Sequence, residues 1–166
     1  ANAPLTSEAF EAHILLADLE DRVGHIGETT RLLKELLAIE RLPRAHRANV
    51  AKRLGDLARR AQDYVEAIRW YDEASALWPM VRDETRYLSA SCAEEAGDVE
   101  VALHGYQALT HAPWRVRGQF AAAKLLERQG RRAELYALYT GLASEPIPEA
   151  KLAGERLAAL HGEQSR

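Results

Sequence analysis

The sequence predicts an all-α fold, an array of about four helical hairpins followed by a terminal helix. Ala, Leu, Glu and Arg dominate the chain and β-branched residues are scarce, a composition that favours helix almost throughout. Two independent sets of helix-breaking positions recur at a period of about 34 residues, the length of a helical hairpin repeat. The expected turns inside the hairpins fall at Gly27, Gln62, Gly97 and Gly130. The expected stops after the hairpins fall at Pro43, Pro79, Pro113 and Pro146.

A helical hairpin that repeats at this period is typical of an α-solenoid, in which each hairpin covers the apolar face of its neighbour. The chain is long enough for one domain with a real core, and 47% of its residues are apolar. We therefore predict a single domain over residues 1–166. A globular helix bundle with accidental spacing is the alternative, and it requires both series to fall into register by chance.

The first hairpin is predicted over residues 6–43. Thr6 gives a capping-type start, and an apolar helical pattern continues until residues 24–27 break it. A second helix is expected from about residue 28 to residue 40, with four leucines on its apolar side.

The second hairpin, residues 44–79, has the most regular pattern. The apolar stripe of its first helix is Leu54, Leu57, Ala58 and Ala61. The stripe of its second helix is Tyr64, Ala67, Ile68, Tyr71, Ala74 and Leu77. Pro79 stops this second helix, because proline has no N–H to donate and its ring clashes with the preceding turn.

The third hairpin is predicted over residues 82–113, with Asp98 placed to cap its second helix. The fourth follows over residues 114–146. A last helix, over about residues 148–161, carries leucines that would cover the final apolar face of the array, with Leu152 among them.

The repeat period resembles that of the tetratricopeptide repeat (TPR) family, and the second hairpin matches the family motif best. The matching residues are Ala51-x2-Leu54-Gly55-x2-Ala58, then Ala67-x3-Tyr71, Ala74 and Pro79. The resemblance covers roughly residues 8–146 and is weakest in the first hairpin. It implies a right-handed superhelix whose first helices line a concave, peptide-binding groove. A HEAT-type array fits less well because its repeats are longer.

Carried over by position, the resemblance implies a partner-binding groove on the first helices of three hairpins. Its candidate residues are Asn49, Lys52, Asp56, Arg59, Arg60, Tyr87, Ser91, Glu94, Arg117, Phe120, Lys124 and Arg128. The three from the third hairpin carry a one-residue uncertainty in register. Some family members clamp a C-terminal carboxylate with Lys and Asn. Lys52 matches that pattern, but Asp56 stands where Asn is expected and would repel the ligand.

Charge is unevenly distributed, although the net charge of the chain is only −3. Residues 41–60 hold seven Arg or Lys and one acid, whereas residues 1–40 hold eight acids and three bases. One interpretation is a basic patch that receives an acidic partner segment or an anionic polymer. The other is mutual neutralisation between the first two hairpins. Nucleic acid is disfavoured, since the patch is one element long and has no interleaved aromatic residues.

The sequence offers no catalytic, metal or cofactor constellation. No two of the six histidines show the i, i+4 spacing with an acid that a helical zinc site uses, and no glycine-rich phosphate loop follows a strand. The single cysteine, Cys92, lies in a helical pattern that predicts a buried thiol. No window holds the ~18 apolar residues that a membrane-spanning helix needs, and no secretory signal is recognised.

We therefore predict a non-catalytic scaffold that binds a partner protein or peptide segment, without cofactors and without membrane insertion. Its Arg-rich, Ala-rich character resembles bacterial repeat proteins of secretion and exopolysaccharide-export assemblies. Two alternatives stay open, a regulatory or docking domain of a larger enzyme or transporter, and a direct binder of an anionic polysaccharide. The sequence also leaves open a homo-oligomer and the choice between bacterial periplasm and cytoplasm.

Overall fold

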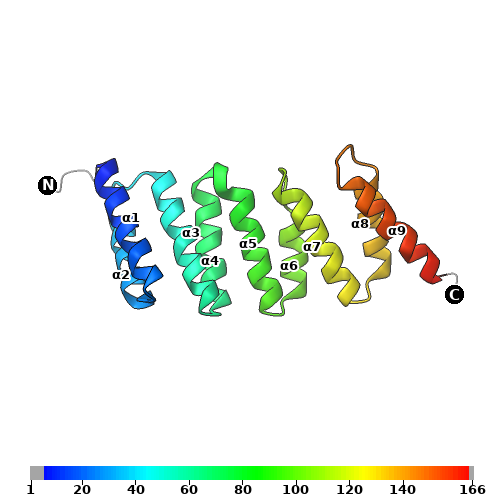
Figure 1. The fold of residues 1–166 in the computed structure, drawn as a ribbon, viewed down its shortest axis with the longest axis horizontal. Coiled ribbons are helices and arrows are strands. Elements are labelled where there is room, and N and C mark those ends of the chain that lie inside the picture. The colour runs from blue at the N-terminus through cyan, green and yellow to red at the C-terminus, as the bar shows by residue number, and fades with distance from the viewer. Residues whose placement is uncertain (1–5, 165–166) are drawn as a thin grey trace. The chain divides into compact units, whose positions relative to one another are not determined.

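The computed structural model describes residues 6–164, and within this range the chain folds into α-helices and one 3₁₀ turn, with no strand (Figure 1). The elements are α1 (Ser7–Arg22), α2 (Ile26–Leu37), α3 (Arg44–Arg60), α4 (Tyr64–Leu77), η1 (Pro79–Val81), α5 (Arg82–Glu95), α6 (Val99–Gln107), α7 (Trp114–Arg128), α8 (Arg132–Ala143) and α9 (Ala150–Gln164). The predicted all-α class is confirmed.

The same backbone geometry closes the four turns inside the hairpins. Each turn contains one residue with positive φ, namely Gly24 (84°), Gln62 (60°), Gly97 (86°) or Gly130 (67°). In each case the N–H of this residue donates to the carbonyl three residues back, and the next N–H donates to the carbonyl five residues back. This is the Schellman arrangement, which satisfies the last carbonyls of a helix and prefers glycine at the left-handed position.

The predicted first turn at Gly27 is wrong, because Gly27 lies inside α2 and Gly24 holds the left-handed position. Gly24 N–H donates to the Asp21 carbonyl at 3.0 Å, and His25 N–H donates to the Glu20 carbonyl at 2.9 Å. α2 therefore begins at Ile26 and ends at Leu37, slightly earlier than predicted at each end. The predicted caps at Thr6 and Asp98 are present, since Thr6 accepts from Ala9 N–H and Asp98 accepts from Val101 N–H.

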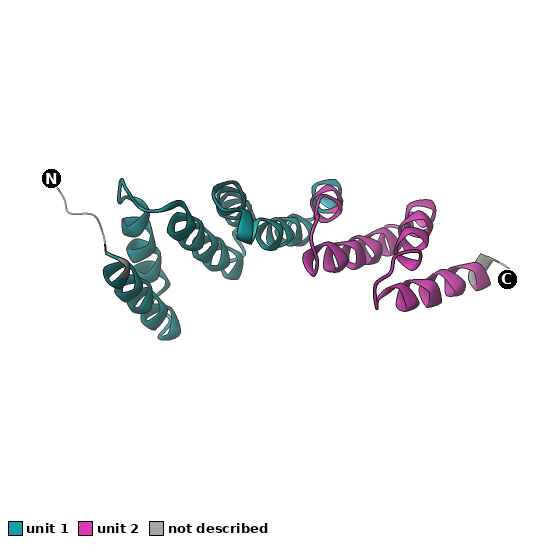
Figure 2. Cartoon of the chain, turned by 90° about the horizontal axis from the view of Figure 1, so that it is seen from above, with its two compact units in different colours: residues 1–102 teal, residues 103–166 magenta. Residues whose placement is uncertain are grey.

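The chain divides into two compact units, residues 1–102 and 103–166 (Figure 2). In unit 1, α1 packs on α2, α2 on α3, α3 on α4 and α4 on α5. Its core includes fully buried Val50, Ala51 and Ala74. Gly55 allows α3 and α4 to approach closely, because a Cβ at this position would lie 2.7 Å from the Tyr71 ring.

In unit 2, α7 packs on α8 and α8 on α9. Gly118 of α7 likewise allows a close approach between helices, since a Cβ there would lie 2.8 Å from the carbonyl oxygen of Tyr106 in α6. The terminal helix α9 begins at Ala150, just after the predicted Pro148, and buries Ala153. The prediction that Leu152 covers the final apolar face is wrong, because this side chain is 44% exposed and the smaller neighbour makes the close contact. The predicted single domain over residues 1–166 stays a prediction.

Candidate functional site

Charged side chains from α1, α3 and α5 form a set of ion pairs in unit 1, which we call the charged face. Its members are Asp18, Asp21, Lys52, Arg53, Asp56, Arg59, Arg60, Glu84 and Glu95. All of them project from the first helices of the first three hairpins. These are the helices that the family resemblance assigns to the binding groove.

Two arginines of α3 pair with the acidic side of α1. Arg53 forms an ion pair with Asp18, in which both terminal guanidinium nitrogens face the carboxylate. Arg60 Nη2 lies 2.6 Å from Asp21 Oδ1. The structure thus shows, for these two cations, the neutralisation between the first and second hairpins that the sequence left open.

Two further cations of α3 pair with α5. Lys52 Nζ lies 3.3 Å from Glu84 Oε1, and Arg59 Nη2 lies 2.6 Å from Glu95 Oε1. The hydrogen bond from Arg59 to Glu95 raises the pKa of the guanidinium, so this side chain remains a cation at any relevant pH. Four of the seven cations in residues 41–60 are consequently paired with carboxylates of neighbouring hairpins.

Asp56 is the carboxylate at the centre of the charged face. It accepts a hydrogen bond from the Tyr71 hydroxyl at 2.7 Å and another from Lys52 Nζ at 3.4 Å. Burial of the Tyr71 ring, together with its hydrogen bond to Asp56, raises the pKa of the phenol. Since Lys52 already faces two carboxylates, the arrangement does not resemble an open clamp for a ligand carboxylate.

The other three cations of residues 41–60 lie apart from the charged face. Arg47 is half-buried and donates to the carbonyls of Leu37 and Ile39, at 3.1 and 3.2 Å, where it caps the end of α2. Arg41 and Arg44 are exposed near the start of α3, and neither forms an ion pair with any residue in the described range 6–164.

Among the predicted groove residues, Lys52 pairs with Asp56 and Arg59 contacts Ser91. Asp56, Arg59 and Arg60 line one pocket. The Ser91 hydroxyl accepts from Arg59 at 3.5 Å and donates to Glu95. Asn49 is exposed one turn before Arg53 and accepts a hydrogen bond from it at 3.0 Å.

Tyr87 and Glu94 are half-buried on α5. The sequence reasoning missed four carboxylates of the face, Asp18, Asp21, Glu84 and Glu95. The acidic excess of residues 1–40 was the available signal for the first two.

The remaining candidates lie on α7 of unit 2 and are described by themselves. The Arg117 guanidinium lies over the Trp114 ring, 4.8 Å from its centroid. The half-buried Phe120 ring lies 6.4 Å from the Tyr139 ring. Lys124 and Arg128 are exposed on the same stripe. α7 thus presents cations and an aromatic edge on one side.

Two hollows adjoin the charged face. An open pocket of about 490 Å³ is lined by Asp56, Arg59, Arg60, Gln62, Tyr64 and Glu95. A smaller pocket of about 90 Å³ lies between α1, α2 and α3, with Asp18, Asp21, Arg53 and Arg60 at its edge. Both are lined by charged groups whose positions are fixed by their ion pairs.

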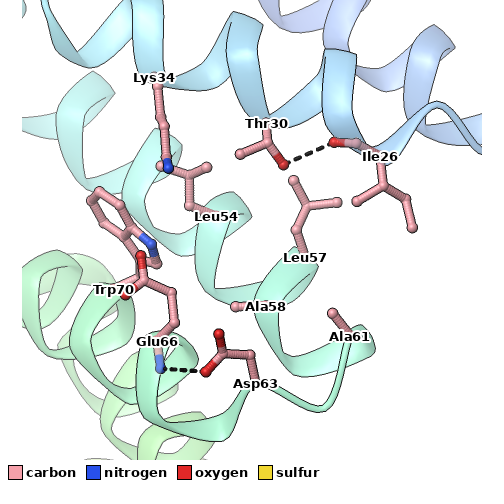
Figure 3. Close-up of a pocket in the computed structure, with 10 residues that line it drawn as sticks. All are labelled: Ile26, Thr30, Lys34, Leu54, Leu57, Ala58, Ala61, Asp63, Glu66 and Trp70. Atoms are coloured by element: carbon pink, nitrogen blue, oxygen red, sulfur yellow. Dashed lines mark hydrogen bonds between the residues drawn. The ribbon is translucent and has the colours of Figure 1, made fainter.

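A third pocket, of about 180 Å³, lies between α2, α3 and α4 and is drawn in Figure 3. Leu54, Leu57 and Trp70 form much of its apolar wall. Two of its polar groups are occupied, since the Thr30 hydroxyl donates to the Ile26 carbonyl and Asp63 accepts from the Glu66 N–H. This volume is below the ~300 Å³ typical of small-molecule sites.

The three tryptophans differ in exposure. Trp70 is 7% exposed and packs in the core, whereas Trp78 is 38% exposed beside the largely accessible Met80 of η1. Trp114 is half-buried under Arg117. Filling between helices therefore accounts for Trp70, and Trp78 lies at the surface.

Among residues 6–164, no group of three or more His, Cys, Asp and Glu side chains could hold a metal ion. Cys92 is fully buried, and burial raises the pKa of its thiol to about 11, which keeps it protonated and poorly nucleophilic. No helix in the described part of the chain combines the length and the apolar character that crossing a membrane requires.

Comparison with solved structures finds a similar fold in PcrH, whose crystal structure was determined in complex with the chaperone binding region of PopD. The two chains superpose with a TM-score of 0.53 at 17% sequence identity, over 99% of each chain. No model of a protein family matches this chain, and no curated protein matches it. The likeness to PcrH is one of fold, and it confirms the predicted TPR-like array of helical hairpins.

Proposed function

We propose that this protein is a non-catalytic scaffold that binds a segment of a partner protein on the charged face of unit 1. One observation carries the proposal. Charged side chains from the first helices of three successive hairpins are held in place by ion pairs. The side chains in the ion pairs that join two helices nevertheless remain about 27–54% exposed. Such a surface presents fixed donors and acceptors to a peptide without a large ordering cost on binding.

The balance of charge on this face indicates the kind of partner. Five carboxylates accompany four cations, so the face has no net positive charge to attract a polyanion. A segment that carries both signs can pair with either member of each ion pair. We therefore favour a mixed-charge partner segment over the acidic segment, or the anionic polysaccharide, that the sequence suggested.

The PcrH structure supports this proposal, because a chain with a similar helical array was solved there in complex with a region of another protein. A scaffold role in a bacterial secretion or exopolysaccharide-export assembly stays a prediction. So does the alternative that the chain is a docking domain of a larger enzyme or transporter.

The test uses a library of immobilised short peptides, screened with the full chain, followed by titration of the selected peptides in solution. Replacing both Arg59 and Arg60 with Glu reverses two charges on the face. The control replaces both Arg41 and Arg44 with Glu, which makes the same change in net charge at exposed positions outside the face.

We expect the control to keep the affinity of the wild type, and the Arg59→Glu/Arg60→Glu variant to bind at least about tenfold more weakly. Far-UV circular dichroism confirms that both variants are folded. The proposal is wrong if the folded Arg59→Glu/Arg60→Glu variant binds every selected peptide as tightly as the wild type does, or if the library yields no binder.

A further inference from the structure

Helix α1 has a second apolar face that points away from the core of unit 1. Leu15, Leu19 and Val23 follow one another four residues apart and are 63%, 58% and 65% exposed. Leu16, at 44%, adjoins this row. The core side of the same helix is the opposite one, where Phe10 and Ala17 are buried. We call the row of Leu15, Leu16, Leu19 and Val23 the outer stripe.

An isolated exposed leucine is ordinary, but four large exposed apolar side chains in the last turns of α1 and at its C-cap residue Val23 are not. A helix with apolar residues on opposite sides is normally covered on both. In the described part of the chain, α1 packs mainly on one helix of unit 1, which is α2. The opposite side of α1 is therefore left uncovered by unit 1. The outer stripe thus has the character of an interface.

The charges beside the outer stripe select its occupant. Glu8 and Glu11 lie beside the stripe near the start of α1, and Arg22 lies beside it at the end of the helix. All three side chains are exposed, and none pairs with another residue between positions 6 and 164. Glu20 also borders the stripe near Val23, but it faces His25 at 2.7 Å. The remaining charges are acidic at one end of the stripe and basic at the other.

The charge patterns of two copies complement each other when their α1 helices run antiparallel. With two α1 helices antiparallel, Leu15 and Leu19 of one copy lie against Leu19 and Leu15 of the other. The acidic start of each helix then lies beside Arg22 of its partner. A parallel arrangement would place like charges together. An isologous contact of this kind is the commonest way in which soluble proteins form dimers.

We propose that the outer stripe binds the same stripe of a second copy of this chain, through antiparallel packing of the two α1 helices. Asp18 and Asp21 project from another side of α1, toward α3, so the charged face remains accessible in this dimer. The stripe is small compared with the ~1,200–2,000 Å² that stable interfaces bury, and the dimer is accordingly weak and dependent on concentration.

The test measures molar mass by sedimentation equilibrium over about three decades of protein concentration. The wild type should pass from monomer to dimer. The Leu15→Gln/Leu19→Gln variant should dimerise at least about tenfold more weakly, since both leucines lie at the centre of the contact. The control is Leu152→Gln on α9, which replaces a leucine that is 44% exposed and is not part of the outer stripe, and it should be without effect.

A charge exchange tests the antiparallel arrangement. Arg22→Glu alone should weaken the dimer, because it places three acids together. Combining it with Glu8→Arg and Glu11→Arg should restore the wild-type dimer, since the charge pattern is then reversed in both copies.

A wild type that stays monomeric throughout overturns the proposal and assigns the stripe to another protein or to a further segment of chain. A dimer that persists undiminished in the Leu15→Gln/Leu19→Gln variant overturns it as well. Failure of the triple exchange to restore association rules out the antiparallel packing that we propose.

Discussion

Replacing Gly55 with Ala tests the packing that holds α3 against α4. A Cβ built at Gly55 lies 2.7 and 2.8 Å from two carbons of the Tyr71 ring, about 1 Å closer than a normal carbon–carbon contact. The ring cannot swing aside freely, because it is fully buried and its hydroxyl donates to Asp56 at 2.7 Å. Overpacking of this kind costs about 1–3 kcal/mol, and the better helix propensity of alanine recovers about 1 kcal/mol.

We therefore expect Gly55→Ala to lower the free energy of unfolding by up to about 2 kcal/mol, measured by urea denaturation followed by circular dichroism. The matched control is Gly141→Ala in α8, where nothing lies within 4 Å of the added carbon. Because propensity acts alone there, stability should be unchanged or higher by up to about 1 kcal/mol.

A double-mutant cycle assigns the cost to the tyrosine ring. In a Tyr71→Leu background the ring is absent, so adding the methyl group at Gly55 should be neutral or stabilising, with a coupling of at least about 1 kcal/mol between the two sites. The reasoning is refuted if Gly55→Ala raises stability as much as Gly141→Ala does, or if its cost is the same with and without the Tyr71 ring.

Three further predictions concern single groups. Gln62→Gly should stabilise the fold by about 0.5–1 kcal/mol, measured by urea denaturation. The reason is that Gln62 has a positive φ of 60°, whereas glycine holds the equivalent position in the other three turns. A loss of stability would contradict this prediction. Native Cys92 should react with a thiol reagent at about pH 8 more than about tenfold more slowly than the unfolded chain, since burial raises the pKa of its thiol to about 11, and equal rates would show that the thiol is accessible. Hydrogen bonds from Arg115, at 2.8 and 2.5 Å, lower the pKa of Glu145, so the pair stabilises unit 2 above the ordinary glutamate pKa and that contribution fades as the pH falls through the lowered value. Arg115→Ala should therefore move the Glu145 carboxyl titration upward in a carbon-13 NMR experiment, and an unchanged titration would exclude this cause.

The repeat could be predicted from the sequence because its helix-breaking residues act locally. Gly97 and Gly130 take left-handed positions that glycine alone adopts without strain, and each lies between two stretches of helical periodicity. The error in the first turn has the same origin. Gly24 and Gly27 are both plausible turn residues by composition, and only the hydrogen bonds of the surrounding backbone decide between them.

The charged face was only half predictable for a different reason. Position in the repeat placed Lys52, Arg59 and Arg60 among the groove candidates, and their role in binding stays a prediction. Whether those cations form ion pairs depends on side chains of other hairpins, which lie far away in sequence. Helix periodicity does not predict which side chains come into contact between hairpins. A count of charges by segment raised neutralisation as one of two interpretations, but the pairing of Arg53 with Asp18 and of Arg59 with Glu95 became visible only in three dimensions.

The energetics of these ion pairs bear directly on the proposed function. Partly exposed pairs such as Arg60 with Asp21 contribute about 0–1 kcal/mol each, because water already solvates both partners well. A bound segment can therefore exchange one partner of a pair for its own charge at little cost in stability. Because such an exchange also yields little net affinity, binding strength must come from the hollows beside the charges, and the charges themselves would select which segment binds and in which direction.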